Sequence, residues 1–341
     1  MTRPPGAVNV VMATVSLLVA SLSIPTVLSA QATAATASAR VDSATHRKRF
    51  VQVNGASVEL LEWGGTGQLM LFLPGFGNSA HVFDDLAPAF TGQFRVAALT
   101  PRGVPPSSAP DAGYTIAQLA EDVRSIVNAL GARTVILVGH SIAGAVITEF
   151  GVTHPNRLAA AIYLDASFDF GAAFRQSRRV GRPAPRETTS AAYRAWEARY
   201  SDSLLSRSIL NAIHVESGMW EIDSADASRR LRLLQPLADE VRSREHAPWR
   251  VRAPLLAVCA VGSMDRGFGW LTSDSARWKE ARAFADRAIR EKQKDCAQVA
   301  NRAPHARVIN LDSGHYVFMD ARKATLRAMR TFLAELRQRR Q

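Results

Sequence analysis

The sequence predicts an α/β fold with a mostly parallel central sheet and helices on both of its faces. Short runs rich in valine, isoleucine and leucine recur along the chain, and segments with helical spacing separate them. Parallel strands need long crossovers of this kind. The 341 residues, 47% of them hydrophobic, suffice for one domain of this type with an insertion.

The N-terminal segment, residues 1–39, differs in composition from the rest of the chain. It has one charged residue, Arg3, followed by an apolar run from Val8 to Leu28 and a tail rich in alanine, threonine and serine. This order is typical of a signal peptide and a small-residue linker. Polar interruptions of the run favour this interpretation over an uncleaved membrane anchor. We therefore expect an exported protein, periplasmic or secreted, with its cleavage site left open.

The first predicted strands form a hairpin. Residues 50–54 and 57–63 are strand-like and are joined through Asn54-Gly55, a pair typical of tight hairpin turns. The next strand, 69–73, is wholly apolar and ends in the glycine-rich turn Pro74-Gly75-Phe76-Gly77. A helix is expected over residues 116–130.

The stretch after that helix is the most informative one. Residues 134–138 are suited to a buried parallel strand, and a helix starts at Ile142. Ser141 would then lie on a sharp strand-to-helix turn. Such a turn has room only for small residues two positions before and after the serine, which are Gly139 and Ala143 here. Its hydroxyl would project beside the positive end of the helix, as a nucleophile does. The alternative is a serine that only caps the helix.

This turn resembles the Gly-x-Ser-x-Gly nucleophile elbow of the α/β-hydrolase superfamily, with Ala143 in place of the second glycine. The segment from Thr100 to Ser108 resembles a loop of the same family. The resemblance extends from about Phe50 to the C-terminus and is greatest to carboxylesterase-like members. A serine elbow argues against the epoxide hydrolases and haloalkane dehalogenases, which attack with an aspartate. The resemblance implies the α/β-hydrolase fold with an inserted helical cap.

The resemblance also implies an oxyanion hole. In the family, the glycine-rich turn supplies one backbone N–H donor, which corresponds to Phe76. The residue after the nucleophile, Ile142, supplies the second donor. Pro74 stands where the family usually has a histidine. Loss of one such donor typically costs about 3–4 kcal/mol of transition-state stabilisation.

A serine hydroxyl needs a histidine base, because it is a poor nucleophile at neutral pH. His315 follows the last predicted strand, 306–311, where α/β-hydrolases carry their base. His140 is the variable residue of the elbow and is expected to pack beneath the turn. The other histidines lie in segments that look like surface loops, helices or a cap: His46, His81, His154, His214, His246 and His305.

The carboxylate that orients the base has two candidates. Asp265 follows the strand 254–261, which is the usual position of the acid in the family, and is preferred. Asp165 ends the strand 160–164 and is the alternative acid, because some relatives draw their acid from there. A structural role is the alternative for either one.

Domain boundaries follow from the loss of strand regularity after Asp165. We expect a first part of the hydrolase core over residues 40–165, a helical cap over 166–250 and the second part of the core over 251–341. The charge-rich stretch 273–301 is expected to be one or two surface helices without a ligand site.

The chain has two cysteines, Cys259 and Cys296. In an oxidising compartment they could form a disulfide, while a buried free thiol at Cys259 is the alternative, and the sequence leaves this open. No motif with the spacing of a zinc site or a nucleotide-binding loop is visible. No cofactor and no metal are therefore expected, since triad chemistry needs neither.

The formal net charge of +12 is spread along the chain. Because no basic block or nucleic-acid motif accompanies it, we expect no nucleic-acid partner. Weak association with anionic surfaces fits such a charge. The oligomeric state is not predicted.

Together these features predict a serine hydrolase that cleaves carboxylic esters of small to medium substrates through an acyl-enzyme. Amide, thioester, lactone or C–C bond hydrolysis by the same triad is an alternative. A second alternative, of a different class, is a hydrolase-fold protein that binds a ligand with little turnover.

Overall fold

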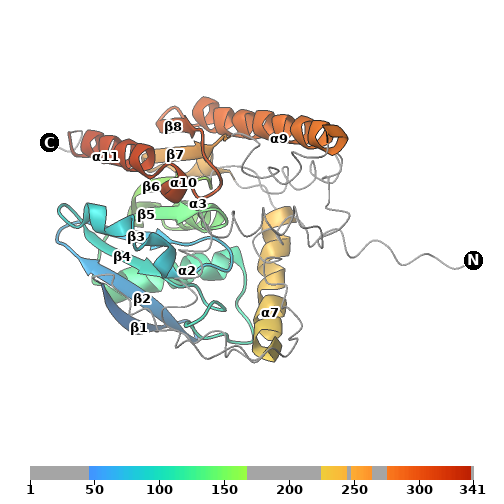
Figure 1. The fold of residues 1–341 in the computed structure, drawn as a ribbon. Coiled ribbons are helices and arrows are strands. Elements are labelled where there is room, and N and C mark those ends of the chain that lie inside the picture. The colour runs from blue at the N-terminus through green and yellow to red at the C-terminus, as the bar shows by residue number, and fades with distance from the viewer. Residues whose placement is uncertain (1–45, 167–223, 244–246, 263–274, 339–341) are drawn as a thin grey trace, which may run out of the picture. The chain divides into compact units, whose positions relative to one another are not determined.

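The computed structural model describes residues 46–166, 224–243, 247–262 and 275–338, all of which belong to one unit formed by residues 40–341. Eight strands form a single sheet in the order β1-β2-β4-β3-β5-β6-β7-β8 (Figure 1). β1 pairs antiparallel with β2, and β2 with β4, whereas every later pairing is parallel. The prediction of a mostly parallel sheet is confirmed.

The strands are β1 (Arg47–Val53), β2 (Ala56–Gly64), β3 (Leu69–Leu73), β4 (Arg95–Leu99), β5 (Val135–His140), β6 (Leu158–Leu164), β7 (Leu255–Ala260) and β8 (Ala306–Leu311). The α-helices described are α2 (Ile116–Ala129), α3 (Ala143–Thr153), α7 (Ser224–Ser243), α9 (Ser275–Arg302), α10 (Val317–Asp320) and α11 (Arg322–Gln338). Short 3-10 helices are η1 (Ala80–Phe83), η2 (Ala87–Phe90), η3 (Pro155–Arg157) and η6 (Pro248–Arg250).

The predicted hairpin forms between β1 and β2. Val53 pairs with Ala56, so Asn54 and Gly55 alone make the connection. Both have positive φ angles, 45° and 77°, which a two-residue turn of this hand requires and which asparagine and glycine tolerate.

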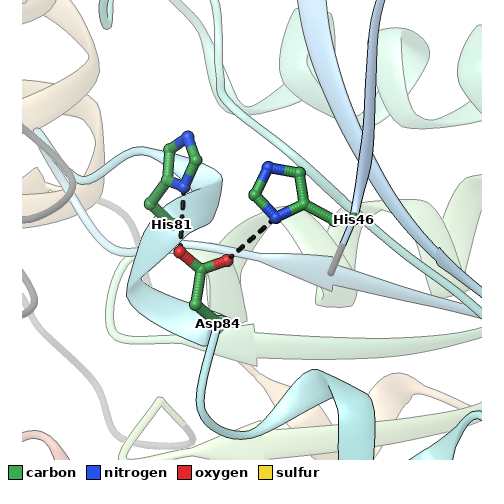
Figure 2. Close-up of side chains that lie close together, drawn as sticks. All are labelled: His46, His81 and Asp84. Carbon is green, nitrogen blue, oxygen red and sulfur yellow. Dashed lines mark hydrogen bonds and ion pairs between the residues drawn. The ribbon is translucent and has the colours of Figure 1, made fainter. Parts of the chain in front are cut away.

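The side chains of His46 and His81 are buried, which the sequence did not predict. His46 precedes β1, and His81 lies in η1 directly after the glycine-rich turn; their side chains are 3% and 1% exposed. Both point toward the carboxylate of Asp84 (Figure 2). Their burial leaves no local signal in the sequence, because it results from contacts between η1 and the residue before β1, which are far apart in the chain.

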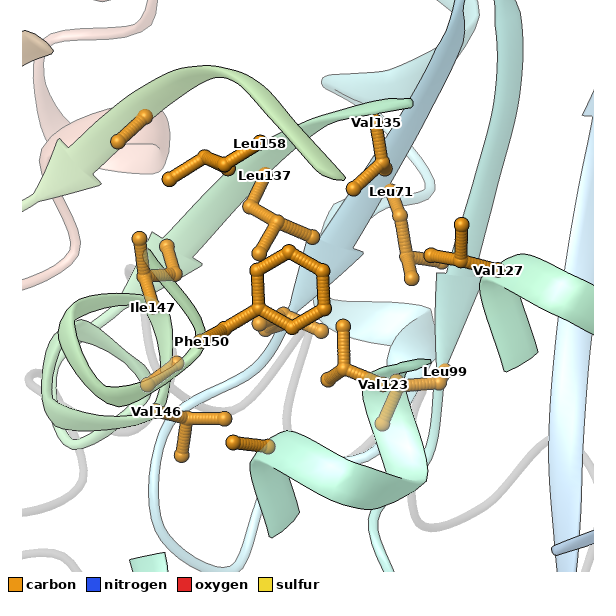
Figure 3. Packing of buried hydrophobic residues seen from close by; sticks show 14 of the residues in the cluster. Leu71, Leu99, Val123, Val127, Val135, Leu137, Val146, Ile147, Phe150 and Leu158 are labelled. Carbon is orange, nitrogen blue, oxygen red and sulfur yellow. The ribbon is translucent and has the colours of Figure 1, made fainter. Parts of the chain in front are cut away.

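The core lies between the sheet and the helices that cover it. Every residue of β3, β5, β6 and β7 is buried, as is usual for strands with helices on both faces. Phe150 of α3 packs between Leu137 of β5 and Val123 of α2 (Figure 3). Burial of a side chain of this size stabilises the fold by about 1.5–3 kcal/mol.

α9 is attached covalently to the sheet. A disulfide joins Cys259 in β7 to Cys296 in α9, 37 positions apart in sequence. The question that the sequence left open is thereby answered in favour of the disulfide. The charge-rich stretch predicted as one or two helices is a single helix from Ser275.

The predicted cap is described only in part. α7 lies within the range 166–250 and packs on α2 and α3 through Leu234, Leu237 and Val241. Residues 167–223 lie outside the described residues, so the cap as a whole stays a prediction. Within the described ranges, none of the helices has the length and hydropathy that a membrane crossing needs.

Candidate active site

Ser141 lies on the turn between β5 and α3. Its φ angle of 55° falls in the left-handed region, which costs a residue with a Cβ about 1–2 kcal/mol. The cost is tolerated because both sides of the turn are fixed by packing and hydrogen bonds. The Ser141 amide donates to the Leu164 carbonyl of the neighbouring strand at 3.3 Å. This strained conformation is that of a nucleophile elbow.

Close packing explains the small residues around Ser141. A Cβ on Gly139 would lie 2.6 Å from the Ile147 side chain and 3.1 Å from the Cβ of Ala143. A Cβ on Gly144 would lie 1.9 Å from the carbonyl oxygen of Ala166. Residues 139 and 143 are therefore small for the reason that the sequence predicted. Gly144 lets α3 approach the end of β6.

His315 lies between β8 and α10, and its Nδ1 is 2.6 Å from Oδ2 of Asp165. Asp165 follows β6, is 1% exposed and also has a positive φ of 49°. This is the hydrogen bond expected of the acid of a triad. Asp265, which the sequence analysis preferred, lies outside the described residues. The structure thus brings the alternative acid, Asp165, against His315, and the preference for Asp265 stays a prediction.

The carboxylate of Asp165 is surrounded by donors. Besides His315, the Lys292 ammonium lies 2.5 Å from Oδ2, and the backbone amide of Ala260 donates to Oδ1 at 2.9 Å. Burial by itself raises the pKa of Asp165, but the Lys292 charge and the His315 hydrogen bond outweigh burial and lower the pKa to about 2. Asp165 is thus a carboxylate at every pH at which a histidine can act as a base.

Lys292 was missed by the sequence analysis, which expected no functional contact from this helix. Lys292 precedes Cys296 by four residues, so both side chains lie on one face of α9. Because Cys296 is bonded to β7, Lys292 is directed toward the same edge of the sheet as Asp165. The four-residue spacing between Lys292 and Cys296 was the available signal. It could be used only if the disulfide of Cys296 was already known.

His140 packs beneath the turn, as the sequence analysis expected. Its side chain is fully buried, and its ring lies 4.5 Å from the His315 ring between centroids. Nε2 is 3.1 Å from the His315 carbonyl oxygen and donates to it. Burial, and next the charge of a protonated His315, lower the pKa of His140 well below its usual range. His140 is therefore a neutral support for His315.

The structure does not join Ser141 and His315 by a hydrogen bond. Within the described residues, neither the Ser141 hydroxyl nor Nε2 of His315 has a partner within hydrogen-bond distance. In unliganded active sites this contact is often long and shortens only when substrate is bound. Ser141 follows His140 directly, and the His140 ring lies against that of His315, so the two side chains belong to one site.

Phe76 lies in the glycine-rich turn after β3, and Ile142 directly follows Ser141. Neither backbone amide donates to another of the described residues. The turn that carries Phe76 is closed by the bond from the Asn78 amide to the Gly75 carbonyl at 3.1 Å, and the Tyr316 hydroxyl donates to Oδ1 of Asn78.

The same turn lies directly against the elbow. A Cβ on Gly75 would be 2.8 Å from Nδ1 of His140 and 3.2 Å from Cβ of Ser141. The close approach of this backbone to Ser141 therefore requires glycine at position 75.

A small apolar cavity of about 50 Å³ lies beside the elbow. Its lining includes Phe76 and Ile142, Val146 of α3, and Leu234 and Leu237 of α7. The cavity can therefore take an uncharged hydrocarbon group next to the proposed oxyanion donors.

Comparison with known families gives one match that covers most of the chain. Residues 70–328 match the model of the alpha/beta hydrolase family. Among curated proteins, the chain is similar to a putative non-heme haloperoxidase of Mycobacterium phage D29, 31% identical over 104 residues, which are 30% of this chain and 37% of that protein. It is also similar to a fluoroacetate dehalogenase of Burkholderia sp, 30% identical over 123 residues, 35% of this chain and 40% of the relative. The matches thus span well under half of these relatives.

Solved structures are similar in fold over a larger part of the chain than these relatives. The E-2-(acetamidomethylene)succinate hydrolase structure covers 85% of this chain and 99% of its own, with a TM-score of 0.58 and 21% identity. A thermophilic esterase from Thermogutta terrifontis covers 85% and 99%, with a TM-score of 0.54 and 20% identity. At such identities the likeness concerns the fold alone. The names of the matched relatives describe several different activities.

Proposed function

Because this chain belongs to the alpha/beta hydrolase family, we propose that it is a serine hydrolase that cleaves carboxylic esters of small to medium size. The observation that carries the proposal is the bond of 2.6 Å between His315 and Asp165 behind a serine with φ of 55°. A serine, and not an aspartate, stands at the elbow, which favours an acyl-enzyme.

In this proposal, Oγ of Ser141 attacks the ester carbonyl while Nε2 of His315 takes the hydroxyl proton. The amides of Phe76 and Ile142 donate to the oxyanion that forms. His315 then gives its proton to the departing alkoxide, and the acyl group stays on Ser141. Water attacks this acyl-enzyme with His315 again as the base, and the acid leaves.

Asp165 and Lys292 act on His315 and not on the substrate. The buried carboxylate holds the hydrogen on Nδ1, so that Nε2 faces the serine as an acceptor, and it stabilises the imidazolium that forms in each step. Lys292 is a positioning residue in this scheme, because its ammonium keeps Asp165 ionised and oriented.

The apolar lining of the cavity supports the proposal that the preferred substrates have an uncharged acyl group. Its wall is formed by aliphatic side chains, among them Val146, Leu234 and Leu237. An acyl chain that extends from the carbonyl carbon past Ile142 would enter this space. We propose that the cavity sets the acyl-chain preference.

Hydrolysis of p-nitrophenyl esters from acetate to long acyl chains tests the proposal, with Ser141→Ala as the comparison. We expect turnover by the wild type with an optimum at an intermediate chain length, and none above background for Ser141→Ala. Labelling by a fluorophosphonate reports the activated serine independently of the substrate. A labelled Ser141 without ester turnover would refute the ester assignment, and a folded chain that is not labelled would refute the serine hydrolase.

The cellular setting is part of the proposal. The composition of residues 1–39 supports export to the periplasm or the outside, and the disulfide is of a kind that persists in oxidising compartments. The net charge of +12 supports weak association with anionic surfaces, which salt would screen.

A further inference from the structure

His46, His81 and Asp84 lie together outside the catalytic machinery (Figure 2). We propose that they form a binding site for a divalent transition metal, with Zn²⁺ as the ion that fits best. The three side chains come from two segments far apart in sequence, the residue before β1 and the η1 region. This distance explains why a search for spaced motifs does not find them.

The geometry of the three side chains is that of a shared ligand sphere. One donor atom from each lies within 4.8 Å of the others. Nδ1 of His81 is 2.9 Å from one oxygen of Asp84, and Nδ1 of His46 is 3.6 Å from the other. The two rings lie 5.1 Å apart between centroids with 63° between their planes, so they converge on the carboxylate from different directions.

Burial sets this group apart from a surface ion pair. The side chains of His46 and His81 are almost fully buried, whereas Asp84 is 24% exposed. The site is therefore built into the protein and still accessible from one side. An ion held by three protein donors could keep a water molecule as its fourth ligand on that side.

The donor chemistry selects the class of metal. Two neutral imidazoles and one carboxylate suit Zn²⁺, Co²⁺, Ni²⁺ and Cu²⁺, whereas Mg²⁺ and Ca²⁺ prefer oxygen donors throughout. Zinc tolerates four ligands without a strong demand on their angles, which suits three side chains from two segments.

A metal here would connect two parts of the fold. His46 directly precedes β1, and His81 follows the turn that carries Phe76. The amide of Ala80, next to His81, already donates to Oγ1 of Thr100 at the end of β4. The bound ion would thus fix the residue before β1 to the region that supports the proposed oxyanion donor, and its role would be structural.

Calorimetric titration of the chain without an affinity tag, freed of metal by a chelator, with ZnCl₂ tests the proposal. We expect one equivalent bound at micromolar or tighter affinity. His46→Gln and Asp84→Asn should each weaken binding at least tenfold. His154→Gln is the matched control: His154 pairs with Glu121 at 2.6 Å, and among the described residues no third metal-binding side chain joins this pair, so binding should not change.

Two further readouts keep the test decisive if a variant folds poorly. Co²⁺ bound to the wild type should give the intense visible absorption of a four-coordinate site. Zn²⁺ should raise the midpoint of urea unfolding in the wild type, because a ligand that binds only the folded state stabilises it. No binding by folded wild type, or equal binding by His46→Gln and His154→Gln, would overturn the proposal. Zinc binding abolished instead by His315→Gln would place the ion in the active site and refute it as well.

Discussion

At the scale of single residues, the carboxylate of Asp165 decides how the site functions. It is buried, it accepts hydrogen bonds from His315, Lys292 and the Ala260 amide, and its pKa is lowered to about 2. A buried carboxylate with fewer donors would hold a proton more readily and orient the histidine less firmly.

Replacing Asp165 by asparagine tests its role as the acid. Asp165→Asn should lower kcat by about three to four orders of magnitude, because the amide favours the wrong tautomer of His315. Asp265→Asn is the control and should stay within a few-fold of the wild type. Steady-state kinetics on an activated ester measures both. The opposite ranking of the two variants would restore Asp265 as the acid.

Lys292→Met tests the ion pair through the pH dependence of stability. A carboxyl with a lowered pKa in the folded state stabilises the protein above its unfolded pKa of about 3.9, and this contribution is lost as pH falls toward the folded pKa of about 2. Removal of Lys292 should therefore cost about 1–2 kcal/mol of unfolding free energy at pH 7.

The cost of Lys292→Met should shrink as pH falls from about 4 to about 2, where Asp165 becomes protonated. Urea unfolding at several pH values gives the difference. Lys294→Met is the control, since Lys294 is 66% exposed and pairs only along the helix surface with Glu291. A cost that does not change between pH 7 and pH 2 would assign Lys292 a packing role only.

At the scale of elements, the site depends on how helices are attached to the sheet. The disulfide fixes α9 on β7 and thereby directs Lys292 to Asp165. α7 packs on α2 and α3 and closes one wall of the cavity. The amide of Ile116, at the start of α2, donates to Glu240 of α7 at 2.8 Å, which fixes α7 at a second point.

Substitutions on α7 test the role of the cavity. Leu234 lines it, whereas the neighbouring Leu233 does not. Leu234→Phe should shift the optimum of the p-nitrophenyl ester series to shorter acyl chains, because the larger ring occupies the space of the chain. Leu233→Phe should leave the optimum unchanged. A shift of equal size in both variants would mean that α7 moved as a whole and that the cavity does not select the chain.

Patterns within the sequence were sufficient for the strands and for the turn that carries Ser141. This turn could be predicted because the packing that it requires is local, such as Gly139 beside Ile147. Contacts between distant segments were not predictable. Which cation of α9 faces inward depends on the disulfide, and which aspartate reaches His315 depends on the ends of β6 and β7 in space.

The same reason explains why the burial of His46 and His81 was not predicted. Neither stands in a run with a recognisable period, and their burial results from how η1 lies against the region before β1. The cap aromatic residues and Asp265 lie outside the described residues, so those expectations stay predictions.

At the scale of the whole molecule, one disulfide bond joins the helix α9 to the strand β7 of the sheet. Cys259 and Cys296 are both 1% exposed. Closing a loop of 37 positions restricts the unfolded chain and stabilises the folded one by about 3–4 kcal/mol in the chain-entropy description. The stability of this protein is therefore expected to depend on the compartment in which it folds.

Production in two compartments tests this dependence. The chain exported to an oxidising periplasm should carry the disulfide, and the chain without residues 1–39 made in a reducing cytosol should lack it and unfold at lower urea concentration. Intact mass and urea unfolding measure the two properties. The double variant Cys259→Ala/Cys296→Ala should unfold at the same urea concentration from either source. A wild type with the same stability with and without the bond would contradict the prediction.

The origin of the carboxylate at the end of β6 bears on how this scaffold can diversify. Ser141 follows β5 and Asp165 follows β6, and these two strands are hydrogen-bonded neighbours, so in the proposed mechanism both groups depend on one pair of strands. The cavity, in contrast, is lined in part by α7, which carries neither group. A combinatorial library over Leu234 and Leu237 would therefore sample new substrate preferences while the proposed triad stays unchanged.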